Sequence, residues 1–146
     1  MNLNKDFREF AELLNFHKVE YLVVGGYALA FHGSPRYTGD IDFWINPTID
    51  NSKKMIKVLN DFGFSSLQLT EKDFQEKDKV FQFGFPPYRI DVLTSVTGLE
   101  FDECYSKRNE ISDDDVKISF IDIESFKINK KAMGRTKDLA DLESLT

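Results

Sequence analysis

The sequence predicts an α+β fold in which a mixed β-sheet is flanked by helices and the C-terminus is helical. Two observations carry this prediction. Apolar stripes at helical spacing alternate with short apolar runs typical of buried strands, and two of the later runs flank a short turn. The 146 residues are enough for one hydrophobic core, and no repeat or low-complexity linker divides them. We therefore expect a single domain over residues 1–146.

The N-terminal part predicts helices and strands in alternation. Apolar residues recur at helical spacing from about Lys5 to Phe16, which indicates an amphipathic helix. Tyr21–Val24 is a short apolar strand that ends at a glycine pair, and Tyr27–His32 follows as a short helix. A second strand is predicted over Asp40–Ile45, and a helix with a buried stripe over Ile49–Asp61.

The C-terminal part begins with signals for β-structure. Val80–Phe83 and Arg89–Leu93 flank the segment GFPP, which predicts an antiparallel hairpin. A further strand is predicted over Val116–Ile121. The last part, from about Ile123 to Leu145, is predicted to be helical, with a break near Gly134.

The net charge of −6 argues against a nucleic-acid binder on overall charge alone. One stretch reverses this balance with five basic residues and no acidic one: Lys127, Lys130, Lys131, Arg135 and Lys137. A solvated helix face and a basic wall for a triphosphate or an RNA both fit this run.

The number of cysteines and the length of the apolar segments indicate the cellular compartment of the protein. Cys104 is the only cysteine, which excludes an intramolecular disulfide and favours a reducing compartment. No apolar segment approaches the length of a membrane span, and the N-terminus lacks a signal-peptide core. We expect a cytoplasmic protein with no membrane association; the sequence does not indicate its oligomeric state.

The most specific feature of the chain is Gly25-Gly26 followed, after thirteen intervening residues, by Asp40-Ile41-Asp42. Side chains alternate along a strand, so Asp40 and Asp42 point to the same face. Two adjacent carboxylates repel each other unless a cation lies between them. A glycine pair at the end of a strand lets the backbone approach a phosphate closely.

A third carboxylate, Asp91, lies in the strand predicted over Arg89–Leu93. If the two Asp-bearing strands are neighbours in one sheet, Asp40, Asp42 and Asp91 come together. Three carboxylates without a histidine or cysteine cluster suit Mg²⁺. Two such ions, roughly 3.5–4 Å apart, can activate an attacking hydroxyl and stabilise a leaving pyrophosphate.

Each of these signals has an ordinary explanation when taken singly, such as a tight turn or a solvated strand face; their order along the chain is much harder to explain in that way. Arg36 and Thr38 directly precede the carboxylates. Both could reach a triphosphate, but Arg36 could equally be a structural counter-ion of Asp40.

The ordered set resembles the nucleotidyltransferase superfamily of the DNA polymerase β type, in its minimal bacterial form. The family pattern is an apolar residue, Gly, Gly or Ser, a gap, and Asp-apolar-Asp, which Val24-Gly25-Gly26 and Asp40-Ile41-Asp42 match. The resemblance assigns Asp91 as the third carboxylate and Gly26 as a triphosphate contact. It extends to the C-terminal stretch Gly134–Leu142, where it implies that Lys137 and Asp138 contribute to nucleotide binding.

The resemblance implies a Mg²⁺-dependent enzyme that transfers a nucleoside monophosphate from a triphosphate such as ATP to a hydroxyl. The acceptor stays open among tRNA, a partner protein and a small molecule such as an antibiotic. Small members of this kind occur in toxin–antitoxin and defence systems. The alternative is a nucleotide-binding or regulatory module of the same fold with little or no turnover, although the intact carboxylate set argues against it. A dinucleotide-binding fold is disfavoured because the Gly-x-Gly-x-x-Gly spacing is absent.

Overall fold

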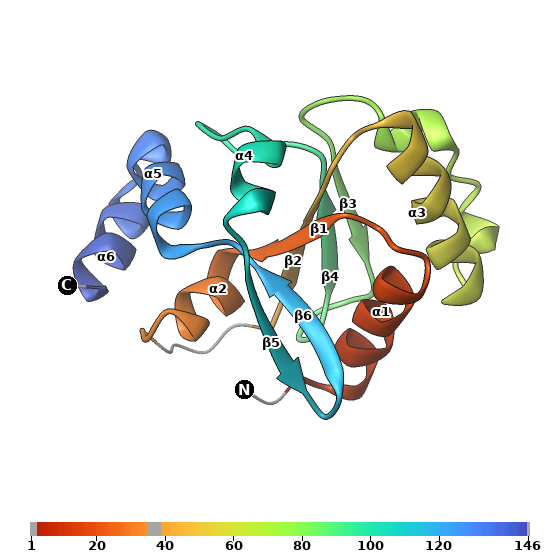
Figure 1. Cartoon of the computed structure of the whole chain (residues 1–146), viewed down its shortest axis with the longest axis horizontal. Coiled ribbons are helices and arrows are strands. Elements are labelled where there is room, and N and C mark those ends of the chain that lie inside the picture. Colours follow the sequence, from red (N-terminus) through yellow and green to blue (C-terminus); the bar gives the residue numbers. More distant parts are fainter. Residues whose placement is uncertain (1–2, 35–38, 146) are drawn as a thin grey trace.

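The structure, a computed structural model, describes residues 3–34 and 39–145. Within these residues it contains a six-stranded sheet with the strand order β3-β4-β2-β1-β6-β5 (Figure 1). The strands are β1 (Tyr21–Val24), β2 (Ile41–Ile45), β3 (Val80–Phe83), β4 (Ile90–Leu93), β5 (Asn109–Asp113) and β6 (Val116–Phe120). The helices are α1 (Lys5–Phe16), α2 (Gly25–Phe31), α3 (Ile49–Asp61), α4 (Phe101–Ser106), α5 (Ile123–Met133) and α6 (Thr136–Ser144), with single 3₁₀ turns at Ser65–Leu67 and Glu71–Phe74.

The sheet is mixed, as predicted. β1 pairs antiparallel with β2 and parallel with β6, and β2 pairs parallel with β4. The predicted hairpin is confirmed, because β3 runs antiparallel to β4, and β5 forms a second antiparallel pair with β6. The α+β class is therefore confirmed.

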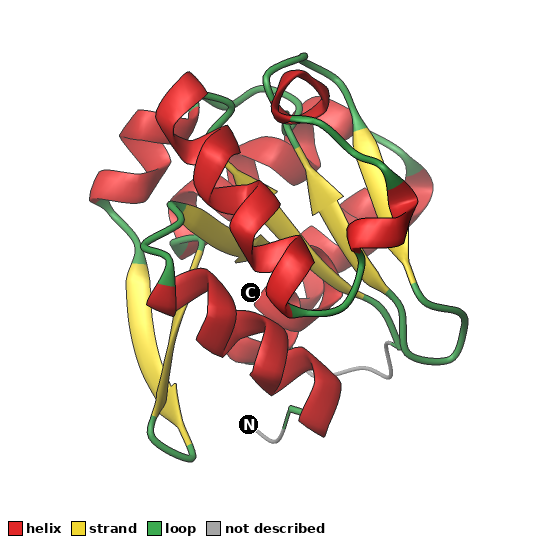
Figure 2. Cartoon of the chain, turned by 90° about the vertical axis from the view of Figure 1, so that its right-hand side faces the viewer, coloured by secondary structure: helices red, strands yellow, loops and turns green. Residues whose placement is uncertain are grey.

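Helices α1 and α3 cover one face of the sheet, and Figure 2 shows both in front of the strands. Phe10 of α1 joins this layer to the sheet, since its ring centroid lies 5.3 Å from that of Phe43 on β2 and 5.2 Å from that of Phe62. Phe10 and Phe43 are fully buried. The layer of α1 and α3 therefore packs on the Phe43 side of β2, and the side chains of Asp42 and Trp44 lie on the opposite side of that strand.

Helices α2, α5 and α6 gather at the other end of the molecule (Figure 1). The predicted break in the C-terminal helical region is confirmed at Gly134, which adopts φ +63°. Its N–H donates to the Lys130 carbonyl at 3.0 Å, which closes α5 with a left-handed cap. In the part of the chain that the structure describes, no helix has the length and apolar character needed to cross a membrane.

The structure differs from the sequence prediction at three places. Helix α2 begins at Gly25, two residues earlier than predicted, because the chain turns directly out of β1 at the glycine pair. Helix α4 and strand β5 were not predicted, since both are short and largely exposed. Three consecutive aspartates, Asp113 to Asp115, predict a solvated loop, but only Asp114 and Asp115 lie in one; Asp113 ends β5, is buried and lies 3.5 Å from the Arg8 guanidinium.

Candidate active site

The structure brings Asp42 and Asp91 together at the centre of the sheet. They are direct partners across the parallel pair β2–β4, and Val24, the last residue of β1, is the partner of Asp42 on the other side. Gly25 and Gly26 follow Val24 in the chain. The carboxylates and the glycine turn therefore meet at one point.

The close approach of the backbone turn to the Asp42 carboxylate requires a glycine at position 25. It adopts φ +68°, and a Cβ placed on it would overlap the Asp42 carboxylate. A left-handed conformation costs an ordinary residue roughly 1–2 kcal/mol, and here the added methyl would also displace a site carboxylate. The turn can thus reach Asp42 only without a side chain.

We predict that Gly25→Ala lowers nucleotidyl transfer by about 100-fold, because a misplacement of about 1 Å at a reacting centre has effects of this size. Gly63→Ala is the matched control, since Gly63 also has a positive φ, +93°, but nothing lies within 4 Å of an added Cβ. Gly25→Ala is expected to lose more stability in urea unfolding than Gly63→Ala, because its Cβ also meets the Asp42 carboxylate, so transfer is compared under conditions in which both variants are folded. Equal transfer activity in the two variants would contradict the role given to Gly25.

Arg89 is the counter-ion of this cluster. Its Nε lies 2.7 Å from Asp91 Oδ1, and its Nη2 lies 3.0 Å from both Asp91 Oδ2 and Asp40 Oδ2. Arg89 is not among the site residues predicted from the sequence. Its spacing of two residues from Asp91 on a strand, which places both on one face, was the available signal.

The single positive charge of Arg89 is too little to compensate the negative charges around Asp42. Burial, and then the negative charges of Asp91 and Asp40, raise its pKa to about 7, against a smaller lowering effect of Arg89. One guanidinium therefore does not compensate three carboxylates. A further cation at Asp42 would remove this cost.

The donor chemistry fits Mg²⁺, because carboxylate oxygens are the ligands that this ion prefers. In the arrangement seen across residues 3–34 and 39–145, however, no group of three or more metal-binding side chains is set to hold an ion. Arg89 instead spans Asp40 and Asp91. The residues present fit a divalent cation by type and by the shortage of positive charge at Asp42.

A cavity of about 380 Å³ opens beside Asp40 and Asp42, whereas the buried Asp91 is not among its lining residues. Its walls come from the glycine turn, the two first aspartates, the segment after β4, and the C-terminal helices: Gly25, Gly26, Asp40, Asp42, Ser95–Thr97, Asn129, Lys130, Met133, Arg135 and Lys137 are among its lining residues. Lys137 therefore lines the cavity together with the glycine pair, whereas Asp138 is fully buried and is not among these lining residues. Arg36 and Thr38 lie outside the described residues.

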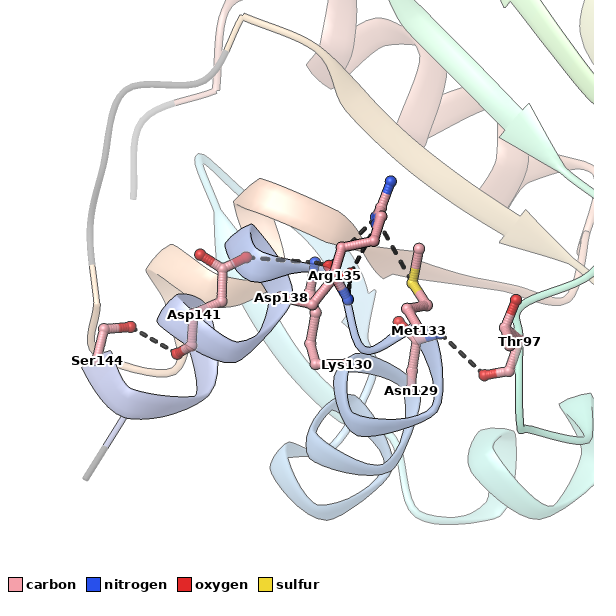
Figure 3. A network of polar contacts seen from close by, with 8 residues as sticks. All are labelled: Thr97, Asn129, Lys130, Met133, Arg135, Asp138, Asp141 and Ser144. Carbon is pink, nitrogen blue, oxygen red and sulfur yellow. Dashed lines mark hydrogen bonds and ion pairs between the residues drawn. The ribbon is translucent and has the colours of Figure 1, made fainter.

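Behind the cavity wall, a buried ionic network fixes Lys130 (Figure 3). Its Nζ lies 3.4 Å from Asp138 Oδ1 and 3.3 Å from Asp141 Oδ2, and its side chain is 8% exposed. Arg135 Nε donates to Asp138 Oδ2 at 2.7 Å, and mainly for this reason the pKa of Asp138 is lowered to about 2. Asp138 and Asp141 thus hold two basic side chains of the cavity wall. The sequence showed Lys130 only as one member of a basic run.

Comparisons with known proteins agree with this architecture. No protein-family model matches the chain, and no curated protein sequence does. Among solved structures, the chain is similar to the TM1012 protein of Thermotoga maritima, for which a nucleotidyltransferase function has been proposed. That likeness has a TM-score of 0.64 at 13% identity and covers 94% of this chain and 88% of the other.

It is also similar to the lincosamide antibiotic adenylyltransferase LnuA, solved with lincomycin bound. Here the TM-score is 0.56 at 15% identity, with 98% of this chain and 96% of LnuA covered. At such identities the likeness establishes the fold alone. The chain therefore has a minimal nucleotidyltransferase fold, as the resemblance of its motifs implied.

Proposed function

We propose that this protein is a Mg²⁺-dependent nucleotidyltransferase that transfers a nucleoside monophosphate from a nucleoside triphosphate to an acceptor hydroxyl. The observation that carries the proposal is the direct pairing of Asp42 with Asp91 beside a side-chain-free turn at Gly25. The fold shared with LnuA and the TM1012 protein supports it.

Each group of residues in the candidate site has a task in this reaction. Asp40, Asp42 and Asp91 would hold the Mg²⁺ ions, which when bound neutralise charge on the phosphates. The backbone at Gly25 and Gly26 would approach the triphosphate. Lys137 and the buried Lys130, both in the cavity wall, supply positive charge toward the leaving pyrophosphate.

The transfer is a single displacement at phosphorus. The acceptor oxygen attacks the α-phosphorus, and the bond from that phosphorus to the oxygen bridging to the β-phosphate breaks. Pyrophosphate leaves with the bonding electron pair, and the acceptor proton passes to Asp91. Asp91 suits this task because it adjoins Asp42, while its bidentate contact with Arg89 sets its orientation.

The adenylyltransferase neighbour favours ATP as the donor. For the acceptor we retain tRNA, a partner protein and a small molecule, the last supported by the lincomycin bound to LnuA. The toxin–antitoxin or defence role belongs to the same proposal, as does a cytoplasmic location.

A second candidate function is a nucleotide-binding module without turnover. The contacts of Arg89 favour it, since the guanidinium bridges Asp40 and Asp91 where catalysis requires a metal ion. Such a module would bind nucleotide but leave the acceptor unlabelled.

One assay separates the two functions. The protein is incubated with each α-³²P-labelled nucleoside triphosphate, Mg²⁺, and either total tRNA, the product of a neighbouring gene, or lincomycin. We expect label transfer from ATP that EDTA abolishes. Mg²⁺-dependent ATP binding without transfer would establish the module instead, and the absence of both would exclude the two functions together.

A further inference from the structure

A groove of about 710 Å³ lies beside helix α1, and none of its described lining residues also lines the cavity beside Asp42. Four of these residues are apolar: Leu13 and Phe16 of α1, and Phe62 and Phe64, which follow α3. Phe16 is 76% exposed. A contiguous apolar patch that faces solvent is typical of an interaction site. We call this feature the α1 groove.

Packing beneath the α1 groove holds it in shape. The ring of Phe62 packs edge-on against the buried ring of Phe10 on α1, with centroids 5.2 Å apart. At the rim, His17 Nε2 lies 2.6 Å from Asp61 Oδ2, which joins the end of α1 to the end of α3. The groove therefore exists before a ligand arrives, and binding requires little ordering of the protein.

The rim of the α1 groove is acidic. It carries four exposed carboxylates, those of Asp6, Glu9, Glu12 and Asp61, and its described lining includes no lysine or arginine. Lys5 approaches Glu9 only to 3.9 Å, and both side chains are exposed. Such a pair contributes little and leaves the carboxylate free to exchange partners. The rim therefore favours a basic ligand and repels an acidic one.

The α1 groove follows one face of its helix. Asp6, Glu9, Leu13 and Phe16 are three, four and three residues apart, a spacing that aligns them in one stripe. Ten residues of helix correspond to about 15 Å. A second helix can lie along this stripe because it satisfies its own backbone hydrogen bonds. An extended segment would need a strand edge, and none of the described lining residues belongs to a strand.

A second copy of this chain offers one helix of matching chemistry, α5. It places Lys127 and Lys131 beside Ile128, which is half exposed. A contact between α5 of one copy and α1 of another joins two different surfaces, however, and does not close into a symmetric dimer. Each copy also has a net charge of −6, so copies repel one another. A separate partner fits the groove better.

We propose that the α1 groove binds a basic amphipathic helix of a partner protein. Apolar side chains of that helix pack against Phe16 and the two phenylalanines after α3, and its lysine or arginine side chains face the four carboxylates. The inference does not depend on the proposed nucleotidyl transfer, since every residue that carries it lies outside the candidate active site.

The α1 groove and the candidate active site lie on opposite faces of the sheet. The ring of Phe64 stacks on that of Phe83 of β3, with centroids 5.1 Å apart, and Phe83 pairs with Ile90 of β4. Ile90 and Asp91 are adjacent in β4, so their side chains point to opposite faces. A helix in the α1 groove therefore leaves the cavity beside Asp42 accessible.

The binding test uses a fluorescein-labelled peptide of about 18 leucine and lysine residues, with leucine at helical spacing along one face. Its fluorescence anisotropy is recorded while the intact protein is added in roughly 0.15 M salt. One control peptide has glutamate in place of lysine, and another has the same composition without an apolar face. We expect saturable binding of the probe and about tenfold weaker binding of both controls. Equal binding of a control, or no saturable binding of the probe, would overturn the proposal.

Phe16→Ser is expected to weaken binding of the probe about tenfold, because aromatic side chains supply much of the binding energy at such surfaces. Phe16 is exposed, so the stability of the fold should be unchanged. Phe85→Ser is the matched control, since Phe85 is 86% exposed and does not line the groove. The same affinity in Phe16→Ser and in the wild type would refute the groove as the binding site.

The double variant Glu9→Gln, Glu12→Gln tests the acidic rim separately. We expect about tenfold weaker binding of the probe and a smaller dependence on salt. Glu103→Gln, Glu124→Gln is the control, since both glutamates are exposed on helices and neither lines the groove. An equal loss in the two double variants would indicate general attraction to an acidic protein and would contradict the proposal.

Two further measurements distinguish the remaining outcomes. Phe16→Ser should leave the sedimentation of the free protein unchanged; self-association that this variant abolishes would identify a second copy as the occupant and overturn the proposal. A saturating concentration of the probe should leave Mg²⁺-dependent ATP binding unchanged, and competition between them would contradict the placement on opposite faces. If ATP binding is absent with and without the probe, the proposed function fails while the groove is still decided by the peptide titrations.

Discussion

Replacing Asp42 by asparagine is expected to lower nucleotidyl transfer about 10³-fold, the size of effect seen when one charged or polar group is removed from a pre-arranged catalytic centre. Asp42 faces Asp91 across the strand pair and lies against the Gly25 turn, so no other described carboxylate can substitute for it. The measurement is kcat/KM for label transfer at fixed Mg²⁺. Asp50→Asn, which changes an exposed carboxylate on α3, should retain full activity.

The same variant is expected to gain stability at pH 8. The pKa of Asp42 is raised to about 7 in the folded protein, above its ordinary value near 4, so folding favours the protonated carboxyl. The cost to the fold is absent below about pH 4, grows as the pH rises from the unfolded pKa near 4 to the folded pKa of about 7, and is complete above that value. Asparagine cannot ionise and avoids this cost.

Urea unfolding without metal at pH 5 and pH 8 provides the check. We expect the advantage of Asp42→Asn over the wild type to be larger at pH 8. A variant that lost both activity and stability at pH 8 would point to a structural role of Asp42 in place of a catalytic one.

Replacing Asp138 by asparagine is expected to lower the free energy of unfolding by about 2–3 kcal/mol at pH 7. This magnitude corresponds to the depression of its pKa to about 2, at 1.36 kcal/mol for each pKa unit. Asp138 is fully buried, accepts from Arg135 and lies beside the buried Lys130. Removing one partner of a buried ionic group is costly because the remaining charge loses its compensation.

The pH dependence of this effect has a defined sign. A carboxyl with a depressed pKa contributes its stability above about pH 4, the value of the unfolded chain, and loses that contribution as the pH falls toward 2. The difference between wild type and variant should therefore be full at pH 7 and smaller at pH 3. Asp6→Asn, in the exposed first turn of α1, should cost less than about 1 kcal/mol at both values.

The local part of the site could be predicted from the sequence. Alternation alone places Asp40, Asp42 and Trp44 on one face, and a glycine pair after an apolar strand indicates a turn that allows close approach. The fold class followed from the same periodicity. These features depend on residues that are close in sequence, so a local sequence pattern is enough to predict them.

The rest depends on contacts between distant segments. The register that sets Asp42 against Asp91 arises from parallel pairing across residues 46–89, and no local signal specifies it. The position of Arg89 between two aspartates depends on this register. Helix α6 departs from the usual pattern, in which apolar residues are buried and charged residues are exposed. It buries Asp138 and Asp141 and exposes Leu139, because the two buried carboxylates compensate the charge of the buried Lys130.

The strand order of the sheet also determines when the site can exist during folding. The glycine turn and Asp42 come early in the chain, Asp91 joins them only after the crossover through α3, and Lys130 and Lys137 arrive with the last two helices. Contacts between such distant segments form late in folding, because closing a long loop costs entropy before the contacts stabilise the fold. A chain still missing α5 and α6 would hold its three aspartates but not the basic side chains opposite them, so the triphosphate binding proposed above would be among the last properties that the fold acquires.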